Sequence, residues 1–159
     1  PAVWARYPEA KFVIIGQGAE ALTKPQHDGI IFTGFVDARA GVRPNLSDYL
    51  SASDIVLVPL DSGSGTRLKI VEAASNARPV VSTHIGAEGQ SFVDGEEILL
   101  TEEMDEAFVA ATLRLLADPD LGQQLGNAAR AKVLERYSWR AQVAKMEQVY
   151  RELGVGGKA

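Results

Sequence analysis

The chain has 159 residues, of which 46% are hydrophobic and 23% are charged, with a net charge of −5 and no cysteine. This average composition predicts one soluble globular domain rather than a disordered chain, and the lack of cysteine excludes disulfides and thiolate metal sites. The acidic balance disfavours a nucleic-acid partner, and no apolar run approaches the ~20 residues that span a bilayer.

Short apolar runs alternate with helical patterns along the chain. Strands are predicted at Phe12–Ile15, Ile30–Thr33, Ile55–Pro59, Pro79–Ser82 and Ile98–Leu100. Helical spacing of apolar residues predicts helices at Thr66–Ala77, Met104–Leu116, Leu121–Arg136 and Trp139–Leu153. Most of the strands are continuously apolar, which is typical of strands covered by helices on both faces. The alternation predicts an α/β fold, a Rossmann-like doubly wound parallel sheet.

Several residues signal the ends of helices and loops. Asp120 is predicted to be the N-cap of the third helix, and Ser138 that of the last one. Gly154 is predicted to stop that last helix, which leaves residues 154–159 as a flexible tail. The stretch Ala38–Asn45 is predicted to be a surface loop.

Open α/β sheets bind ligands at the carboxyl ends of their strands, so residues that follow strands are candidates for a site. Gly16 and Gly18 follow the first strand, where glycine lets the backbone approach a ligand. Ala21 stands where a dinucleotide fingerprint has its third glycine, which disfavours nicotinamide binding. The turn Gly34-Phe35-Val36 follows the second strand and could read the edge of a nucleobase. An ordinary turn is the alternative explanation at both places.

The loop after the third strand is the most informative candidate. Gly63-Ser64-Gly65 leads into the helix predicted from Thr66, and a Gly/Ser loop at a helix N-terminus offers N–H groups and a positive dipole to a phosphate. Lys69 and Glu72 share a helix face with Asn76, where Lys69 could reach the phosphate and Glu72 could accept both hydroxyls of a ribose. The alternative is a solvated Lys–Glu pair worth ~0.2–0.5 kcal/mol.

Two further segments are weaker candidates. Gly86-Ala87-Glu88-Gly89 follows the fourth strand and could line the same cleft, whereas a lone His84 is not a candidate base. Asp118-Pro119-Asp120 formally matches the two-carboxylate metal site of some sugar transferases, but it joins two helices and fits a helix stop and an N-cap. No metal site is therefore predicted.

The segments Gly63–Ala74, Arg78–Thr83 and Gly86–Gly89 together resemble the C-terminal domain of retaining GT-B glycosyltransferases of family 4, also called group 1. Further landmarks occur in the right order, so the resemblance extends over essentially the whole chain. It implies one half of a GT-B fold over residues 1–153, which would bind a UDP-, GDP- or ADP-sugar as the donor.

The resemblance also implies roles for particular residues. Glu72 matches the second glutamate of the family's Glu–seven residues–Glu motif, which holds the donor ribose. Gly65 and Thr66 match the backbone that cradles the distal phosphate, and the turn at Gly34–Val36 matches the nucleobase contact. Such enzymes typically need no metal, because positive side chains and the helix dipole stabilise the leaving diphosphate. Ser64 replaces the first glutamate, which contacts the sugar, so the identity of the sugar stays open.

The family domain begins with a strand and a helix that bring an Arg and a Lys to the diphosphate. Only the end of that helix, near Val3–Tyr7, is expected here, and the missing strand would lie between the strands at Phe12 and Ile55. The acceptor is expected on an absent N-terminal domain, so we assign no catalytic residue to this chain and expect it to be inactive alone. An exposed sheet edge would favour homo-oligomers.

Other functions remain open at this stage. A GT-B-fold sugar-nucleotide epimerase would bind similar donors, and a non-catalytic Rossmann-like module could bind a nucleotide for regulation. An NAD-dependent dehydrogenase is disfavoured by the incomplete glycine fingerprint. The resemblance favours a transferase of polysaccharide biosynthesis in the cytoplasm, which as the full-length enzyme could act peripherally at the inner face of the membrane.

Overall fold

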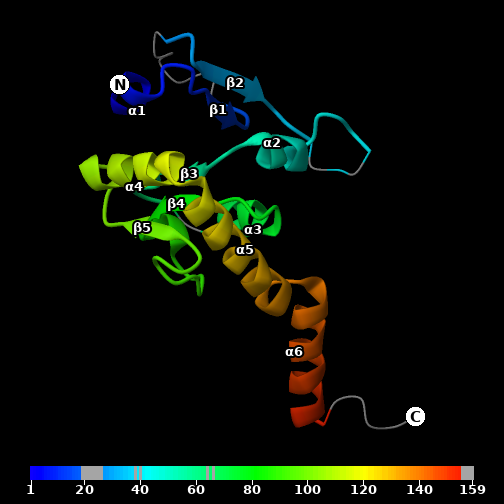
Figure 1. Ribbon diagram of the computed structural model, residues 1–159. Coiled ribbons are helices and arrows are strands. Elements are labelled where there is room, and N and C mark those ends of the chain that lie inside the picture. The colour runs from blue at the N-terminus through cyan, green and yellow to red at the C-terminus, as the bar shows by residue number, and fades with distance from the viewer. Residues whose placement is uncertain (19–26, 38, 40, 64, 66, 155–159) are drawn as a thin grey trace. The chain divides into compact units, whose positions relative to one another are not determined.

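The computed structural model describes residues 1–18, 27–37, 39, 41–63, 65 and 67–154 (Figure 1). The chain divides into two compact units, Pro1–Ser53 and Asp54–Ala159. No helix in the described ranges is both long enough and apolar enough to cross a membrane.

The first unit consists of two short helices and a pair of strands. Its elements are α1 (Ala2–Arg6), β1 (Phe12–Ile15), β2 (Ile30–Gly34) and α2 (Leu46–Ala52). The two strands pair in parallel, with a register shift between Ile14 and Ile15. Trp4 holds α1 against the start of β1, because its ring meets Phe12 edge-on at 5.0 Å and its Nε1 donates to the carbonyl of Ala10 at 2.8 Å.

Helix α2 begins where the predicted surface loop ends. The Asn45 side chain accepts a hydrogen bond from the backbone N–H of Asp48 at 3.1 Å, and the Asp48 carboxylate accepts one from the backbone N–H of Asn45 at 2.8 Å. This reciprocal capping box satisfies two N–H groups that a helix start leaves unpaired. Periodicity did not predict α2, because its seven residues are too few to show an apolar stripe.

The second unit carries a three-stranded sheet and most of the helices. Its elements are β3 (Val56–Val58), α3 (Leu68–Ser75), β4 (Val80–Thr83), the 3-10 turn η2 (Ile85–Ala87), β5 (Leu99–Thr101), α4 (Glu106–Ala117), α5 (Pro119–Arg136) and α6 (Trp139–Glu152). The strand order is β3-β4-β5, and both pairings are parallel. Helix α3 packs on β3 and β4, whereas α4 packs on β4 and β5.

The core of the second unit lies between its sheet and the helices α4 and α5. Its buried residues are Val81, Leu99, Phe108, Leu115 and Leu125. The predicted α/β class with parallel strands is confirmed, and every predicted strand is present within one or two residues. Among the described residues β1 does not pair with β3, so the strands form two sheets.

The helix ends confirm two predictions and correct a third. The Ser138 hydroxyl accepts from the backbone N–H of Ala141 at 3.2 Å as the N-cap of α6, and Gly154 follows that helix with a φ of 68°. Asp120 is not the N-cap of α5: Pro119 occupies the first helical position, and the Asp118 carboxylate accepts from the N–H of Leu121 at 3.0 Å. Proline suits the first position of a helix because it has no N–H to leave unpaired, which moves the cap back to Asp118.

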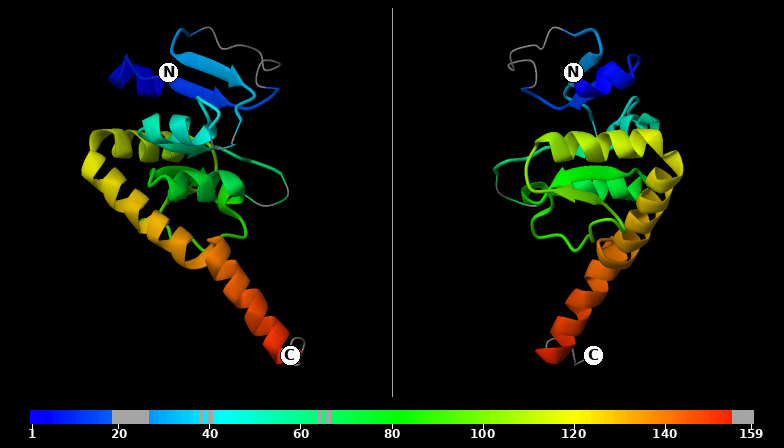
Figure 2. Two further views of the ribbon diagram at one scale, coloured as in Figure 1. Left: turned by 90° about the vertical axis from the view of Figure 1, so that its right-hand side faces the viewer. Right: turned by 60° about the vertical axis from the view of Figure 1, so that its left-hand side comes forward.

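Helix α5 runs obliquely from the end of α4 to the start of α6 (Figure 2). It passes the C-terminal end of α3 at Gly126, where a Cβ atom would lie 2.3 Å from the carbonyl oxygen of Ala77. Helix α6 has the predicted apolar stripe, but none of its residues is buried in this chain. The exposed apolar side chains of α6 are Trp139, Val143, Met146, Val149 and Tyr150.

Candidate functional site

The loop between β3 and α3 is shaped by two glycines. Gly63 has a φ of 133° and Gly65 a φ of 88°, both in the region that favours glycine over residues with a Cβ atom. Gly63 also lies against a side chain, because a Cβ atom there would be 3.2 Å from Nη1 of Arg67. Ser64 and Thr66, which are candidate ligands in this loop, lie outside the described residues.

Helix α3 presents two different faces, as its sequence predicts. Its small apolar stripe is buried at Ile70, Ala73 and Ala74. Lys69 is exposed and Glu72 is half-buried on another face. The helix runs from Leu68 to Ser75, with Asn76 as its C-cap. The predicted range, Thr66–Ala77, was two residues longer at each end.

Glu72 has the surroundings of a carboxylate that can receive a ligand. Burial raises its pKa above the ordinary value, while the positive charge of Lys69 acts in the opposite direction. Within the described ranges, no group donates a hydrogen bond to its carboxylate, and no ion pair joins it to Lys69. Among the described residues, the Glu72 carboxylate is thus half-buried without a hydrogen-bond donor.

Arg67 immediately precedes α3, and its guanidinium points into the protein. Its side chain is only 7% exposed and lies 3.6 Å from the Glu88 carboxylate. Its Nη2 donates to the carbonyl of Gly63 at 2.9 Å, and its Nε donates to the carbonyl of Ile85 at 3.1 Å. The sequence places Arg67 in the loop but gives it no role, because no sequence pattern reveals that a basic side chain at this position is buried.

The segment after β4 lies beside this loop, as its position at a strand end predicts. Thr83 donates its hydroxyl to the carbonyl of Leu60. The Gln90 side-chain Nε2 donates to the backbone carbonyl of Arg67 at 2.5 Å. Gly86 has a packing role there, since a Cβ atom would lie 2.4 Å from Oγ of Ser82 and 2.9 Å from the carbonyl of Val58. Glu88 and Gly89 are exposed.

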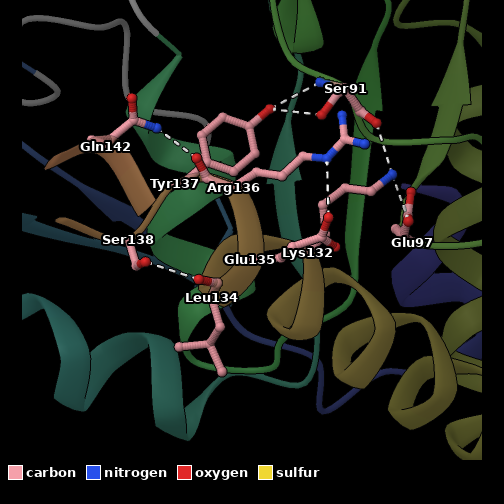
Figure 3. Close-up of polar contacts among 9 residues, drawn as sticks. All are labelled: Ser91, Glu97, Lys132, Leu134, Glu135, Arg136, Tyr137, Ser138 and Gln142. Carbon is pink, nitrogen blue, oxygen red and sulfur yellow. Dashed lines mark hydrogen bonds and ion pairs between the residues drawn. The ribbon is translucent and has the colours of Figure 1, made fainter. Parts of the chain in front are cut away.

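The continuation of that segment, at Ser91 and Glu97, is bound to the end of α5 (Figure 3). Lys132 Nζ lies 2.6 Å from the Glu97 carboxylate and donates to the carbonyl of Ser91 at 2.8 Å. The Tyr137 hydroxyl accepts from the backbone N–H of Ser91 at 2.9 Å, and its ring stacks on Phe92 with centroids 5.7 Å apart. These contacts hold the residue next to Gln90, and Gln90 in turn holds the start of α3.

The remaining predicted ligand-binding residues belong to the first unit. Gly16, Gly18 and Gly34 have φ values of 134°, 82° and 65°. The N–H of Gly16 donates to the carbonyl of Gly34 at 3.1 Å, so the turns after β1 and β2 adjoin. Phe35 is 69% exposed beside a half-buried Val36, which leaves an aromatic face at the turn.

The two histidines have different surroundings. His27 stacks on Trp4 with ring centroids 3.6 Å apart, and its Nδ1 accepts from the N–H of Gly29. His84 is exposed, with its Nε2 3.5 Å from the Glu102 carboxylate. In the part of the chain that the structure describes, no group of three or more His, Asp or Glu residues could hold a metal ion.

The parallel α/β topology is Rossmann-like, and solved structures of GT-B glycosyltransferases share this fold. Sucrose-phosphate synthase from Thermosynechococcus elongatus matches 96% of this chain and 40% of its own, with a TM-score of 0.77 and 26% identity. The C-terminal domain of the group 1 family protein LpcC from Francisella tularensis matches 87% of this chain and 75% of its own, with a TM-score of 0.72 and 23% identity. The Anabaena protein Alr3699/HepE, solved with UDP, matches 92% of this chain and 41% of its own, with a TM-score of 0.72 and 19% identity.

The sequence assigns the family. Residues 1–118 match the family described as Glycosyl transferases group 1, and the chain belongs to it as a C-terminal domain. The phosphatidyl-myo-inositol mannosyltransferase of Mycobacterium leprae is 26% identical over 161 residues, which cover 99% of this chain and 42% of that protein. The N-acetyl-alpha-D-glucosaminyl L-malate synthase of Bacillus anthracis is 28% identical over 91% of this chain and 38% of its own length. The chain thus spans about two-fifths of the length of these curated relatives.

Proposed function

We propose that this chain is the donor-binding domain of a retaining glycosyltransferase. In the full-length protein it would transfer a hexose from a nucleotide-diphosphate sugar to an acceptor held by an N-terminal domain. Glu72 carries the proposal: its half-buried carboxylate has no donor among the described groups and lies one turn beyond Lys69, behind a glycine loop. A nucleoside diphosphate carries both a ribose diol and an anionic group, which a carboxylate one turn beyond a phosphate site would match.

The proposed chemistry follows from that arrangement. The loop N–H groups at Gly65 and Thr66, the dipole of α3 and Lys69 would bind the diphosphate. When the bond between the sugar's anomeric carbon and the distal phosphate oxygen breaks, negative charge develops on that oxygen. Positive groups already in place stabilise this charge without reorganising, so the transfer would need no metal or cofactor. Glu72 would hold the ribose, and Gly16, Gly18 and Gly34–Val36 would contact the nucleoside.

Two solved structures of one relative support a nucleotide sugar as the donor. Alr3699/HepE was solved with UDP and also with UDP-glucose. Their likeness to this chain is one of fold, at 19% and 20% identity, so UDP, GDP and ADP sugars all remain candidate donors. Ser64, which replaces the sugar-contacting glutamate, is the position proposed to distinguish the sugars.

The proposal can be tested by a thermal-shift screen of UDP, GDP and ADP sugars on the full-length protein. A ligand present at 100 times its dissociation constant should stabilise the folded state by about 2.7 kcal/mol. Glu72→Ala should remove most of this shift and the transfer activity. Asp120→Ala is the matched control, because Asp120 is an exposed carboxylate in the first turn of α5.

Three results would contradict the proposal. They are the absence of any shift with all three nucleotide sugars, a shift produced by NAD instead, and full activity of the Glu72→Ala protein. Product analysis separates transfer from epimerisation, since a transferase yields a glycoside and free nucleotide whereas an epimerase returns an altered nucleotide sugar.

A further inference from the structure

Arg67 lies where a cation would be expected to bind a phosphate directly. It is the last residue of the glycine loop and the N-cap of α3. The structure instead turns its guanidinium inward, with 7% of the side chain exposed and carbonyl oxygens as its hydrogen-bond acceptors. The described contacts of the guanidinium are therefore with the protein itself.

We propose that Arg67 is a positioning residue that fixes the conformation of the diphosphate-binding loop. This inference rests on the proposed function. The hydrogen bond from Nη2 to the carbonyl of Gly63 closes the loop upon itself. The bond from Nε to the carbonyl of Ile85 ties the loop to the turn η2 after β4. The loop is thereby held at Gly63 and at Arg67, on either side of the residues proposed to bind the phosphate, which would lower the cost of ordering them on binding.

The geometry requires arginine rather than a cation in general. Nε and Nη2 belong to one planar guanidinium and reach two carbonyl groups that are 22 residues apart in the sequence. The ammonium of lysine is a single point of charge and cannot span two acceptors with the same fixed geometry. A cation that contacts phosphate as a point charge can be replaced by lysine, whereas an arginine that binds phosphate through two donors cannot. Faster amide exchange of the loop in the unliganded variants is therefore the readout that separates positioning from direct contact.

Gly63 and Gln90 add to the same arrangement. A Cβ at Gly63 would lie 3.2 Å from the guanidinium and press on it, and the φ of 133° itself favours glycine there. Gln90 donates to the backbone carbonyl of Arg67 at 2.5 Å, which fixes the main chain at the residue whose side chain fixes the loop. Arg67, the N-cap of α3, is therefore held through both its backbone carbonyl and its side chain.

The test uses the full-length protein with Arg67→Lys and Arg67→Gln. The probes are whichever of UDP, GDP and ADP binds the wild type tightest, and the matching nucleoside without phosphates. We expect both variants to bind the diphosphate about tenfold or more weakly and the nucleoside unchanged, with lysine giving no rescue. Amide hydrogen exchange at residues 60–70 should accelerate in both variants. Arg78→Lys is the matched control, since Arg78 also donates to a backbone carbonyl, that of Asn76, beyond the other end of α3.

Each other outcome overturns the inference in a recognisable way. If Arg67→Lys binds the diphosphate within threefold of the wild type while Arg67→Gln does not, Arg67 is a direct phosphate ligand. If both variants only lower the unfolding midpoint and keep both affinities, its role is confined to stability. If the wild type binds none of the three diphosphates, the proposed function itself fails, and this inference fails with it.

Discussion

At Glu72, burial has opposite consequences for stability and for ligand binding. Desolvation raises the pKa of its carboxyl group in the folded protein above the ordinary value of 4.5. A group whose folded-state pKa is raised contributes stability below its unfolded-state pKa, and this contribution is lost as the pH rises through the folded-state pKa. At neutral pH the charged carboxylate therefore destabilises the fold, which fits a group retained for a ligand rather than for packing.

Glu72→Gln separates these two consequences. Glutamine stays neutral, so the variant should have a higher unfolding midpoint than the wild type at pH 7. The difference should shrink as the pH falls through the raised folded-state pKa of the wild-type carboxyl group, and it should disappear below the ordinary value of 4.5, where that group is neutral in both states. Nucleotide affinity should fall about ten- to a hundredfold, because hydrogen bonds to a charged group contribute about 1.5–3 kcal/mol. Denaturation scans across pH and calorimetry check the two effects, and a lower midpoint at pH 7 would contradict the account.

At the scale of elements, the crossing of α5 over the end of α3 depends on one glycine. A Cβ at Gly126 would lie 2.3 Å from the carbonyl oxygen of Ala77, far inside van der Waals contact, and the obstacle is backbone. Ala77 is itself held in the left-handed region, with a φ of 53°, as the chain leaves α3. One turn earlier on α5, a Cβ at Gly122 would meet Pro79 at an ordinary 3.4 Å.

These two glycines form a matched pair of substitutions. Alanine is favoured over glycine inside a helix by about 1 kcal/mol, so Gly122→Ala should leave the free energy of unfolding unchanged or raise it. Gly126→Ala has the same advantage but must displace α5 from α3, and we expect it to lower that free energy by about 1–3 kcal/mol. Chemical denaturation of both variants measures the contrast. If the two substitutions change the free energy of unfolding equally, α5 does not pack closely enough on the end of α3 to require glycine at position 126.

Elements with a periodic pattern could be predicted from the sequence, and those formed by single contacts could not. The strands are marked by continuous apolar runs and the longer helices by their apolar period, so their predicted ranges agree with the structure to within about two residues. Asp118 was missed as a cap because Asp120 offers the same side chain two positions later, and only the placement of Pro119 decides between them. The 3-10 turn η2 is three residues long and has no pattern to detect.

The candidate site was predictable to a similar extent. The sequence alone reveals a glycine loop before a helix and the spacing of Lys69 and Glu72. The inward turn of Arg67 is not, because its partners Gly63, Ile85 and Glu88 come from different segments and two of the contacts are to carbonyl groups that every residue has. Single-sequence reasoning finds residues by their type, so it misses a residue whose role depends on where its side chain points.

At the scale of the whole molecule, the proposed function separates binding of the donor nucleotide sugar from transfer of its sugar to an acceptor. Transfer requires an acceptor hydroxyl held at the anomeric carbon, and such positioning can account for about 7–11 kcal/mol of an enzyme's barrier reduction. The chain spans about two-fifths of its curated relatives, and the acceptor is proposed to be held by the remaining part. The 159 residues by themselves would thus supply the donor site without the acceptor.

The isolated chain should accordingly form no glycoside from any nucleotide sugar, whereas the full-length protein should. Both proteins are incubated with the donor that gives the largest thermal shift and with a panel of sugar and polyol acceptors, and products are followed by mass spectrometry. Circular dichroism and a cooperative thermal transition first establish that the isolated chain is folded, so that inactivity reflects missing groups rather than unfolding. Glycoside formation by the 159-residue chain would show that this domain holds both substrates, and it would place acceptor-binding groups among the residues assigned here to the donor alone.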